Sequence, residues 1–337
     1  MQLNYKSIAL PFEYPFTISN GRTKTHQPSL VVSLSLGNFT GFGEAPAIVY
    51  YDVTVEKMIE DLESKRAMVE KFALTEPARY WHYLHHLFPQ NPFLVSALDM
   101  ACWDLYGKMK GQPLYTLWNT NWENTPVTDY TIGIDTIPKM LEKMKAKPWP
   151  VYKIKLGTPE DIEIMEALTT ATKAVFRVDA NAGWTTEEAL AKIPLLAKMG
   201  VEFIEQPLAK DNWEGMKILY EKSELPLYAD ESCVMESDVQ KCAGYFHGIN
   251  IKLTKCSGPT PALRMIETAR GLGLKVMMGS MNESTIGSAA IAHFLPQLDH
   301  VDMDGPLLLS EDIASGITFN NGLVTLTNKP GLGITLL

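Results

Sequence analysis

Long apolar runs are absent from this sequence of 337 residues. Its uninterrupted apolar stretches span only a few residues, whereas a helix that crosses a bilayer needs about 20. The N-terminal segment MQLNYKSIAL lacks the charged start, the apolar core and the cleavage site of a secretory signal peptide. These absences predict a cytoplasmic protein that has no membrane partner.

Blocks of lysine and arginine are also absent. The 30 basic residues are outnumbered by 39 acidic ones, which leaves a formal net charge of −9. A surface that follows the phosphates of a nucleic acid needs clustered positive charge. The sequence therefore argues against nucleic acid as a partner.

Closely spaced cysteines are missing as well. The four cysteines, at positions 102, 233, 242 and 256, lie far apart and form no CxxC pair. This spacing argues against a zinc knuckle and against a disulfide framework. We expect four free thiols in or near the core.

The composition that remains is that of a globular protein with a large core. Hydrophobic residues make up 46% and charged residues 20%, with 23 Gly and 21 Pro spread along the chain. This profile excludes disorder, collagen and coiled coil. Because one α/β barrel takes about 250 residues, the length leaves room for a barrel and a smaller companion domain.

The first 120 residues predict an α+β domain. LVVSLSLG (30–37) alternates apolar and small polar residues and leads into the turn NFTGFGEAP, which indicates a β-meander. From Thr54 to about Trp118 the apolar spacing becomes three and four, which is typical of helices. The final segment, 316–337, predicts a β-hairpin tail that returns to this meander and completes the domain.

Residues 121–315 predict a parallel barrel. Eight short apolar runs follow one another, at 130–134, 151–156, 174–180, 201–207, 225–232, 248–253, 274–280 and 300–306. Steps of about 20–26 residues leave room for one crossover helix between successive strands. We expect a closed βα barrel rather than an open doubly wound sheet.

Charged residues stand at the ends of these runs, where a barrel places its active site. They are Lys153, Lys155, Asp179, Glu205, Asp230, Glu231, Lys252, Asp302 and Asp304. Successive positions from Lys155 through Asp179, Glu205 and Asp230 to Lys252 are separated by 24, 26, 25 and 22 residues. Independent surface charges would not keep this spacing.

Three of these residues predict a metal site. Asp179, Glu205 and Asp230 end consecutive strands, so their carboxylates converge and need a cation to offset their repulsion. Oxygen ligands alone favour Mg²⁺, with Mn²⁺ as the second choice. The alternative is that individual acids cap helices or pair with lysines.

The lysines predict acid–base chemistry. Lys153 and Lys155 point to one face of their strand, and Lys252 faces them across the barrel. We expect an interior ammonium group beside another lysine and near a divalent cation to lose its proton more easily than usual, so that two lysines can serve one carbon from both faces. The alternative is that they only neutralise the acids.

These motifs together resemble the enolase superfamily, in its muconate lactonizing enzyme subgroup, over essentially the whole chain. The matching segments are GFGEAP (41–46) with Tyr51, SALDMACWDLYGK (96–108), YKIKLG (152–157), RVDANAGW (177–184), FIEQPL (203–208), ADES (229–232), NIKLTKCSG (250–258) and GLG (331–333). The resemblance implies an α/β protein, namely a modified TIM barrel, (β/α)₇β, with an N-terminal α+β capping domain. Ser257 departs from the family, since many relatives have a glycine there.

The resemblance also implies roles for the site residues. Mg²⁺ would be held by the three carboxylates, and a proton α to a substrate carboxylate would be removed to give an enediolate that the metal stabilises. Lys155 and Lys252 would be the acid–base pair, Lys153 an electrostatic helper and Lys255 a supporting residue.

Asp302 and Asp304 discriminate among the reactions of this subgroup. We expect them to share one strand face, where two carboxylates suit a substrate ammonium group. This DxD element resembles that of dipeptide epimerases of the L-Ala-D/L-Glu type. It implies Mg²⁺-dependent inversion of the α-carbon of the C-terminal residue in an L-Ala-Xaa dipeptide, by two-base 1,1-proton transfer. Alternatives are o-succinylbenzoate synthase, N-acylamino acid racemase, muconate cycloisomerase and a non-catalytic barrel.

The second residue of the dipeptide is left open between acidic and apolar. Arg22, in the turn SNGRTKTHQ (19–27), is a candidate partner for an acidic side chain, whereas Phe16, Ile18 and Tyr50 are candidate walls of an apolar pocket. Ser280, at the end of the seventh strand, is a further candidate for substrate binding. A homo-oligomer is possible.

Overall fold

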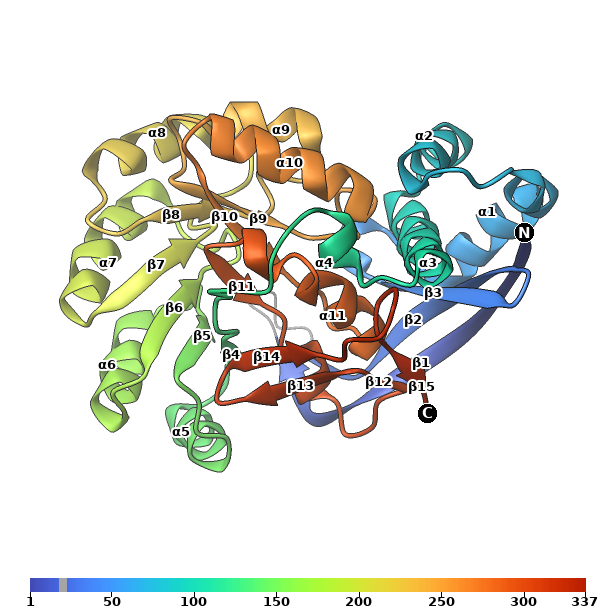
Figure 1. Cartoon of the computed structure of the whole chain (residues 1–337). Helices are drawn as coiled ribbons and strands as arrows, with labels where there is room; N and C mark the ends of the chain where they lie inside the picture. The colour runs from blue at the N-terminus through green and yellow to red at the C-terminus, as the bar shows by residue number, and fades with distance from the viewer. Residues whose placement is uncertain (18–22) are drawn as a thin grey trace.

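The computed structural model describes residues 1–17 and 23–337 and divides into two packed parts, which we call the cap and the barrel (Figure 1). The cap begins with an antiparallel sheet in the order β1 (Gln2–Thr17), β2 (Thr23–Leu36) and β3 (Phe39–Pro46). Three helices follow, α1 (Val55–Lys71), α2 (Pro77–Leu87) and α3 (Pro92–Lys110), of which α1 and α3 pack on the sheet and α2 packs on α3. The predicted meander and the helical segment after it are confirmed.

Local signals in the sequence set the ends of α3. The side chain of Asn91 accepts a hydrogen bond from the backbone N–H of Leu94, and Pro92 occupies the first turn, where no intrahelical N–H is needed. Gly111 ends the helix in the left-handed conformation, with φ 67°.

The glycines of GFGEAP allow β3 to lie directly on α3. A Cβ atom at Gly41 would lie 2.1 Å from the carbonyl oxygen of Ala101, and one at Gly43 would lie 2.0 Å from that of Ala97. Only glycine permits so close an approach of strand to helix. The next residue, Glu44, therefore has a fixed position at the boundary between cap and barrel.

The barrel contains eight parallel strands in sequential order. They are β4 (Tyr130–Ile132), β5 (Val151–Lys155), β6 (Val175–Asp179), β7 (Val201–Glu205), β8 (Leu227–Ala229), β9 (Gly248–Ile251), β10 (Lys275–Gly279) and β11 (His300–Asp302). A parallel bridge between Thr128 and Val301 brings the first and last strands together. The predicted strands are confirmed one by one.

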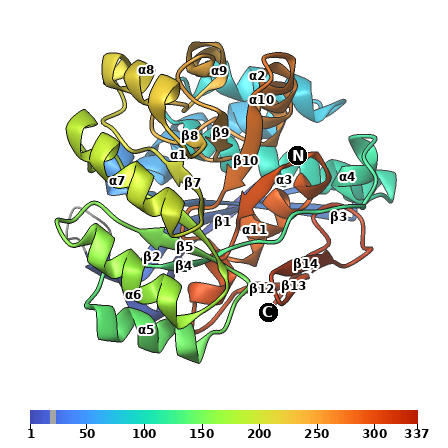
Figure 2. The ribbon, with the colours of Figure 1, turned by 90° about the vertical axis from the view of Figure 1, so that its left-hand side faces the viewer.

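Seven helices connect these strands and line the outside of the barrel, as Figure 2 shows for α5 to α8. They are α5 (Ile137–Ala146), α6 (Asp161–Ala171), α7 (Thr186–Lys198), α8 (Trp213–Lys222), α9 (Glu236–Cys242), α10 (Pro259–Gly271) and α11 (Thr285–Ala292). The last strand is followed by the 3₁₀ turn η3 (Gly305–Leu308) instead of an α-helix. The (β/α)₇β architecture is therefore confirmed.

The C-terminal tail departs from its predicted place. Its hairpin, β13 (Ile317–Asn320) with β14 (Leu323–Leu326), is a separate two-stranded sheet and does not join the meander in the described part of the chain. The tail instead reaches α3, where the N–H of Leu332 donates to Oδ1 of Asp104 at 2.8 Å. It also contacts the barrel, since the N–H of Thr128 donates to the carbonyl of Gly322. Its assignment to the cap, and the boundary at residue 120, stay predictions.

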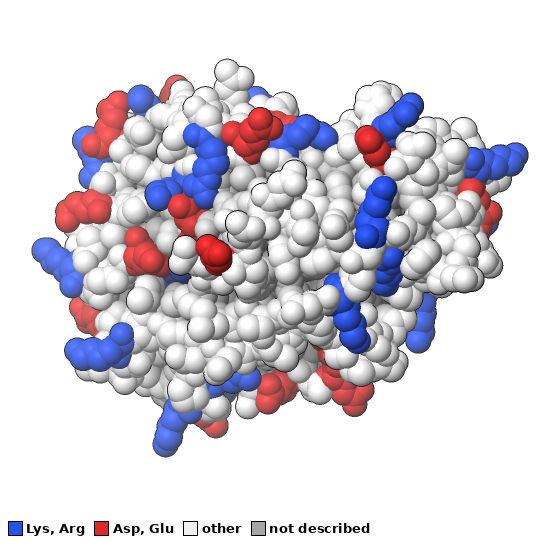
Figure 3. Space-filling model, in the orientation of Figure 1, with Lys and Arg blue, Asp and Glu red and all other residues white. Residues whose placement is uncertain are grey.

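The helices and the surface charge bear on whether a membrane or a nucleic acid could be a partner. No helix in residues 1–17 and 23–337 combines the length and apolar character that a membrane span requires. On the face shown in Figure 3, Lys and Arg side chains are interspersed with Asp and Glu. All four cysteines are buried and free, as expected.

Candidate active site

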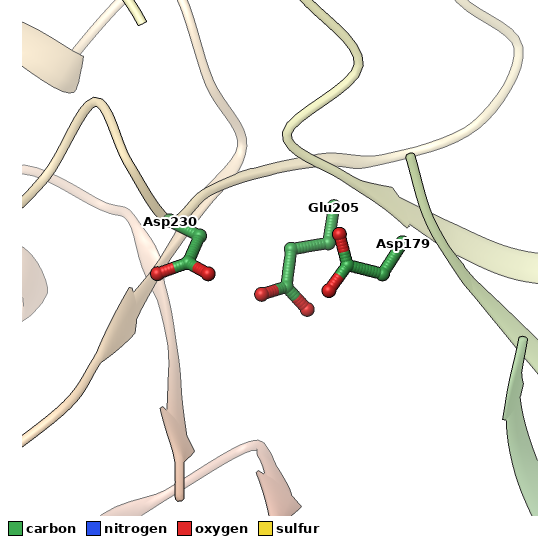
Figure 4. A group of neighbouring side chains, drawn as sticks. All are labelled: Asp179, Glu205 and Asp230. Carbon is green, nitrogen blue, oxygen red and sulfur yellow. The ribbon is translucent and has the colours of Figure 1, made fainter. Parts of the chain in front are cut away.

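The three predicted metal ligands lie together at the C-terminal ends of adjacent strands (Figure 4). Asp179 ends β6, Glu205 ends β7 and Asp230 directly follows β8. One carboxylate oxygen from each lies within 4.8 Å of the other two, and all three side chains are buried. A buried set of three carboxylates fits a hard divalent cation, because oxygen is the ligand that Mg²⁺ prefers and charge repulsion opposes the set without one.

Two amide side chains hold these ligands in place. Asn250 on β9 donates from Nδ2 to Oε1 of Glu205 at 2.7 Å. Oε1 of Gln206 accepts from the N–H groups of Asp230 and Ser232 at 3.0 and 3.1 Å. Gln206 has a φ of 38°, so the backbone at the end of β7 is strained in order to make this clamp. The relative position of Glu205 and Asp230 is thereby fixed before any ion binds.

Lys153 lies beneath the carboxylates and contacts three acids. Its Nζ is 3.2 Å from Asp179, 2.8 Å from Glu205 and 2.7 Å from Asp302. The side chain is 1% exposed. A buried ammonium paired with three acids supports the expected electrostatic role and leaves it no free path to a substrate.

Lys155 and Lys252 face the carboxylates from opposite walls. Nζ of Lys155, at the end of β5, lies 2.6 Å from Oδ2 of Asp179. Nζ of Lys252, after β9, lies 2.8 Å from Oδ2 of Asp230. The strands β5 and β9 are separated by three others in the barrel. Lys255 donates to Oδ1 of Asp230 and so anchors that ligand.

The pKa values of the buried lysines depend on the acids that they contact, and their expected lowering near a divalent cation stays a prediction. Burial lowers the pKa of Lys252, but the charges of Asp230 and Glu205 outweigh it, and the pKa lies above its usual range. The same balance, with Asp302 as the largest favourable charge, raises the pKa of Lys153. The sequence pattern did not indicate that the acids contact the lysines this directly. A divalent cation bound to those acids would offset their charge and reverse the direction.

A cavity of about 250 Å³ lies above these groups, between barrel and cap. Residues singled out from the sequence form much of its wall: Lys155, Asp230, Lys252, Ser280, Asp302 and Asp304. Tyr50 lines the cavity from the cap, as expected for a pocket wall. Arg22 and Ile18 lie outside the described residues, as does the side chain of Phe16.

Asp302 and Asp304 both line the cavity but do not share a strand. Asp302 ends β11, whereas Asp304 lies beyond it and accepts the N–H of Thr131 at 2.6 Å. The predicted common strand face is therefore wrong, because the chain turns into η3 after Asp302. The two carboxylates nevertheless reach the same wall, because Thr131 on the neighbouring strand β4 holds Asp304 there.

The two aspartates differ in charge. Burial opposes ionisation of Asp302, but Lys153 and Lys155 lower its pKa to about 2. Burial and the charge of Asp302 raise the pKa of Asp304 to about 7. The wall therefore holds one carboxylate that is ionised at neutral pH and a second whose pKa lies near neutral pH.

Several cavity residues were missed in the sequence. Lys24 and Ile48 come from the cap, and Asn282 and Leu308 come from loops after β10 and β11. Oε2 of Glu231 is buried without a hydrogen-bond partner in the described structure. Lys24 could have been found by its charge and its position two residues after Arg22, whereas Glu231 was already among the charged strand-end residues of the sequence. Nothing in the pattern signals the apolar residues.

A barrel with three carboxylates on adjacent strands and opposed lysines at their ends defines an enolase-type enzyme. The family model "Enolase C-terminal domain-like" matches residues 137–337. The chain belongs to the enolase superfamily. It is 52% identical over 337 residues, which cover all of both chains, to the L-Ala-D/L-amino acid epimerase of Flavobacterium johnsoniae.

Two solved structures show the same fold. A substrate-liganded L-Ala-D/L-Glu epimerase from Bacillus subtilis has a TM-score of 0.93 and 29% identity, over 99% of this chain and 98% of that one. A dipeptide epimerase from Methylococcus capsulatus, complexed with Mg and L-Arg-D-Lys, has a TM-score of 0.90 and 28% identity, with the same coverage. The recognition made from sequence motifs is confirmed.

Proposed function

We propose that this protein is a Mg²⁺-dependent dipeptide epimerase, an isomerase that inverts the α-carbon of the C-terminal residue of L-Ala-Xaa dipeptides. The observation that carries the proposal is the arrangement of the cavity: lysines on opposite walls and an aspartate pair on a third. The relatives described above support it, since they are named as an L-Ala-D/L-amino acid epimerase, an L-Ala-D/L-Glu epimerase and a dipeptide epimerase.

The residues of the chain divide the chemistry among them. Asp179, Glu205 and Asp230 would hold Mg²⁺, which supplies Lewis-acid stabilisation of a substrate carboxylate when bound. With the α-carbon between the two walls, one lysine takes the α-proton and the other, protonated, delivers a proton to the opposite face. Lys153 keeps the acids beneath the site paired and takes no part in the transfer.

The aspartate pair gives the proposal its substrate class. Two carboxylates on one wall suit an ammonium group and oppose the anionic substrates of muconate cycloisomerase and o-succinylbenzoate synthase. An N-acyl amino acid lacks the ammonium group as well, which argues against N-acylamino acid racemase. A non-catalytic barrel is not favoured, since each expected catalytic position holds the expected residue type.

Acetylating the N-terminus of a good dipeptide substrate should lower kcat/KM by roughly 30-fold or more. Removal of the ammonium group leaves desolvated carboxylates unpaired, at a cost of about 2–5 kcal/mol. The measurement is α-proton exchange with D₂O, followed by NMR for free and acetylated L-Ala-L-Xaa. Equal rates on the two would contradict the dipeptide assignment and favour an N-acylamino acid substrate.

The pH dependence of kcat/KM should carry the signature of Asp304. Because this carboxyl has a pKa of about 7 in the free enzyme, it loses its charge as the pH falls through that value. kcat/KM should then fall by up to about tenfold per pH unit on the acid side. In D304N, kcat/KM should be lower than in the wild type at high pH and should not fall further as the pH decreases through 7. If the decrease remains in D304N, it comes from another titrating group.

The same ionisation gives a stability readout. The folded state holds the proton of Asp304 more tightly than the unfolded chain, where the ordinary value is 3.8. The free energy of unfolding should therefore fall as pH rises from about 4 to about 7. Thermal unfolding at pH 8 should show D304N to be more stable than the wild type.

The proposal extends to the second residue of the dipeptide, the cellular location and the oligomeric state. Lys24 in the cavity wall supports an acidic second residue, with Arg22 as a further candidate, whereas Ile48, Tyr50 and Leu308 support an apolar one. We propose that both classes are accepted, in keeping with the name of the Flavobacterium relative. We also propose a cytoplasmic location, supported by the four free thiols, and a possible homo-oligomer.

A further inference from the structure

Glu44 of the cap places a buried carboxylate against the barrel. It follows the glycines of GFGEAP at the end of β3, is fully buried, and accepts from Oγ of Ser29 at 2.8 Å within the cap. Its other partners belong to the barrel. The N–H of Ser284 donates to both carboxylate oxygens at 3.1 and 3.2 Å, the hydroxyl of Ser284 donates to Oε2, and the N–H of Gly287 donates at 3.4 Å.

These donors form the N-terminus of α11, for which Ser284 is the N-cap. Burial raises the pKa of Glu44, and the hydrogen bonds from Ser284 and Ser29 oppose that rise. A carboxylate at a helix N-terminus also meets the positive end of the helix dipole. The cap thus supplies an acceptor for backbone groups that α11 would otherwise leave unpaired.

The segment that Glu44 grips is part of the cavity wall. Ser280, Met281 and Asn282 line the cavity and lead directly into Ser284. The N–H of Ser280 donates to the carbonyl of Asp302 at 2.6 Å, so the segment is joined at its other end to the aspartate wall. A displacement of the backbone at Ser284 would therefore also displace the residues that line this wall of the cavity.

A second contact ties this segment to Asp304. A Cβ atom at Gly305 would lie 2.7 Å from the carbonyl oxygen of Glu283, so the two backbones are packed with no space between them. Glu283 precedes the residue that Glu44 holds, and Gly305 follows Asp304. The position of Asp304 thus depends on where the backbone at 283–284 is fixed.

We propose that Glu44 is a positioning residue for the ammonium-binding wall: it reaches from the cap to Ser284 and fixes the backbone against which the loop of Asp304 packs. This inference rests on the proposed function, because it assigns the aspartate wall to a substrate ammonium group. Glu44 touches neither the metal carboxylates nor the lysines in the described contacts. Its effect should be confined to recognition of the substrate N-terminus.

The test is E44Q, with S29A as the matched control. Glutamine keeps the size of the side chain but replaces one acceptor oxygen by an NH₂ group, which opposes the N–H groups of Ser284 and Gly287. S29A removes the cap-side hydrogen bond of Glu44 and leaves its barrel contacts in place. The readout is the ratio of kcat/KM for a free dipeptide to that for its desamino analogue, which lacks the ammonium group.

E44Q should lower this ratio by about tenfold, since misplacing a positioned group by ~1 Å can cost on the order of 100-fold. KM for the dipeptide should rise more than kcat falls, and the affinity for Mg²⁺, measured by calorimetry, should stay at the wild-type value. S29A should keep the wild-type ratio. If Glu44 had only a structural role, E44Q would lower kcat/KM equally for both substrates and leave their ratio unchanged.

The outcomes separate the two proposals. A wild-type enzyme that does not discriminate between the two substrates would contradict the ammonium wall itself, and with it the proposed function. Discrimination that survives in E44Q would overturn only the role of Glu44. If E44Q does not fold, S284A takes its place, because it removes both the hydroxyl bond to Glu44 and the N-cap bond from Ile286 that hold this backbone. An unchanged ratio in S284A would then overturn the inference.

Discussion

Replacing Lys155 or Lys252 by alanine should abolish epimerisation, with a loss of at least about 10³-fold in rate. Each direction of the reaction needs one lysine to remove the α-proton and the other to deliver a proton to the opposite face. The two side chains reach the cavity from β5 and β9, with three strands between them, so neither can take the place of the other. The rate is measured by polarimetry on the L,L and L,D forms separately.

Exchange of the α-proton with solvent should survive in each variant for one epimer only. In D₂O, followed by NMR, K155A and K252A should exchange opposite epimers, because each keeps the lysine on one face. K139A, which removes a largely exposed lysine on α5, should match the wild type. If both variants exchange the same epimer, or if either still epimerises at nearly the wild-type rate, the two-base assignment is wrong. One of the two lysines would then act only as an electrostatic support.

Removal of the metal should abolish activity to the limit of detection, and Mg²⁺ should restore it. A cation offsets the repulsion between three buried carboxylates whose oxygens lie within 4.8 Å of one another. The carboxylate of the substrate also needs a Lewis acid to stabilise the charge that develops on it. The measurement is turnover after dialysis against a chelator, followed by titration with Mg²⁺ and with Mn²⁺. Full turnover in excess chelator would remove the metal from the proposal.

E205Q, which changes one of the three proposed metal ligands, should bind Mg²⁺ more weakly than the wild type. Glutamine keeps an oxygen but loses the charge, so the dissociation constant for Mg²⁺ should rise by about 100-fold, in the range seen when metal-site partners are lost. E214Q, at an exposed acid on α8, is the matched control and should bind as the wild type does. Wild-type affinity in E205Q would assign the cation to other ligands.

The barrel could be predicted because its information is local. Each strand is a short apolar run, each crossover helix fits the interval, and the chemistry stands at the last residue of a run, as at Asp179 and Glu205. Strand order then follows sequence order, so side chains far apart in the chain converge without any further assumption. The metal ligands and the opposed lysines could be predicted for that reason.

Other parts of the site depend on contacts that no local pattern carries. Glu44 and Ser284 are 240 positions apart, and their hydrogen bonds follow from how the cap packs on α11. Asp304, beyond the end of its strand, is held at the wall by the N–H of Thr131 in the neighbouring strand. The tail hairpin pairs with itself rather than with the meander, and the hydrogen bond of Leu332 to Asp104 cannot be anticipated from a PGLG turn.

The cavity takes its walls from both the cap and the barrel, and this division has a consequence for how such an enzyme can diversify. Proton transfer and the carboxylate cluster belong to barrel strand ends, whereas Lys24, Ile48, Tyr50 and Tyr51 come from the cap. Substitutions at cap positions can change which second residue is accepted while the reacting groups keep their places. Substrate preference can therefore change through substitutions in the cap, while the reacting residues of the barrel are retained.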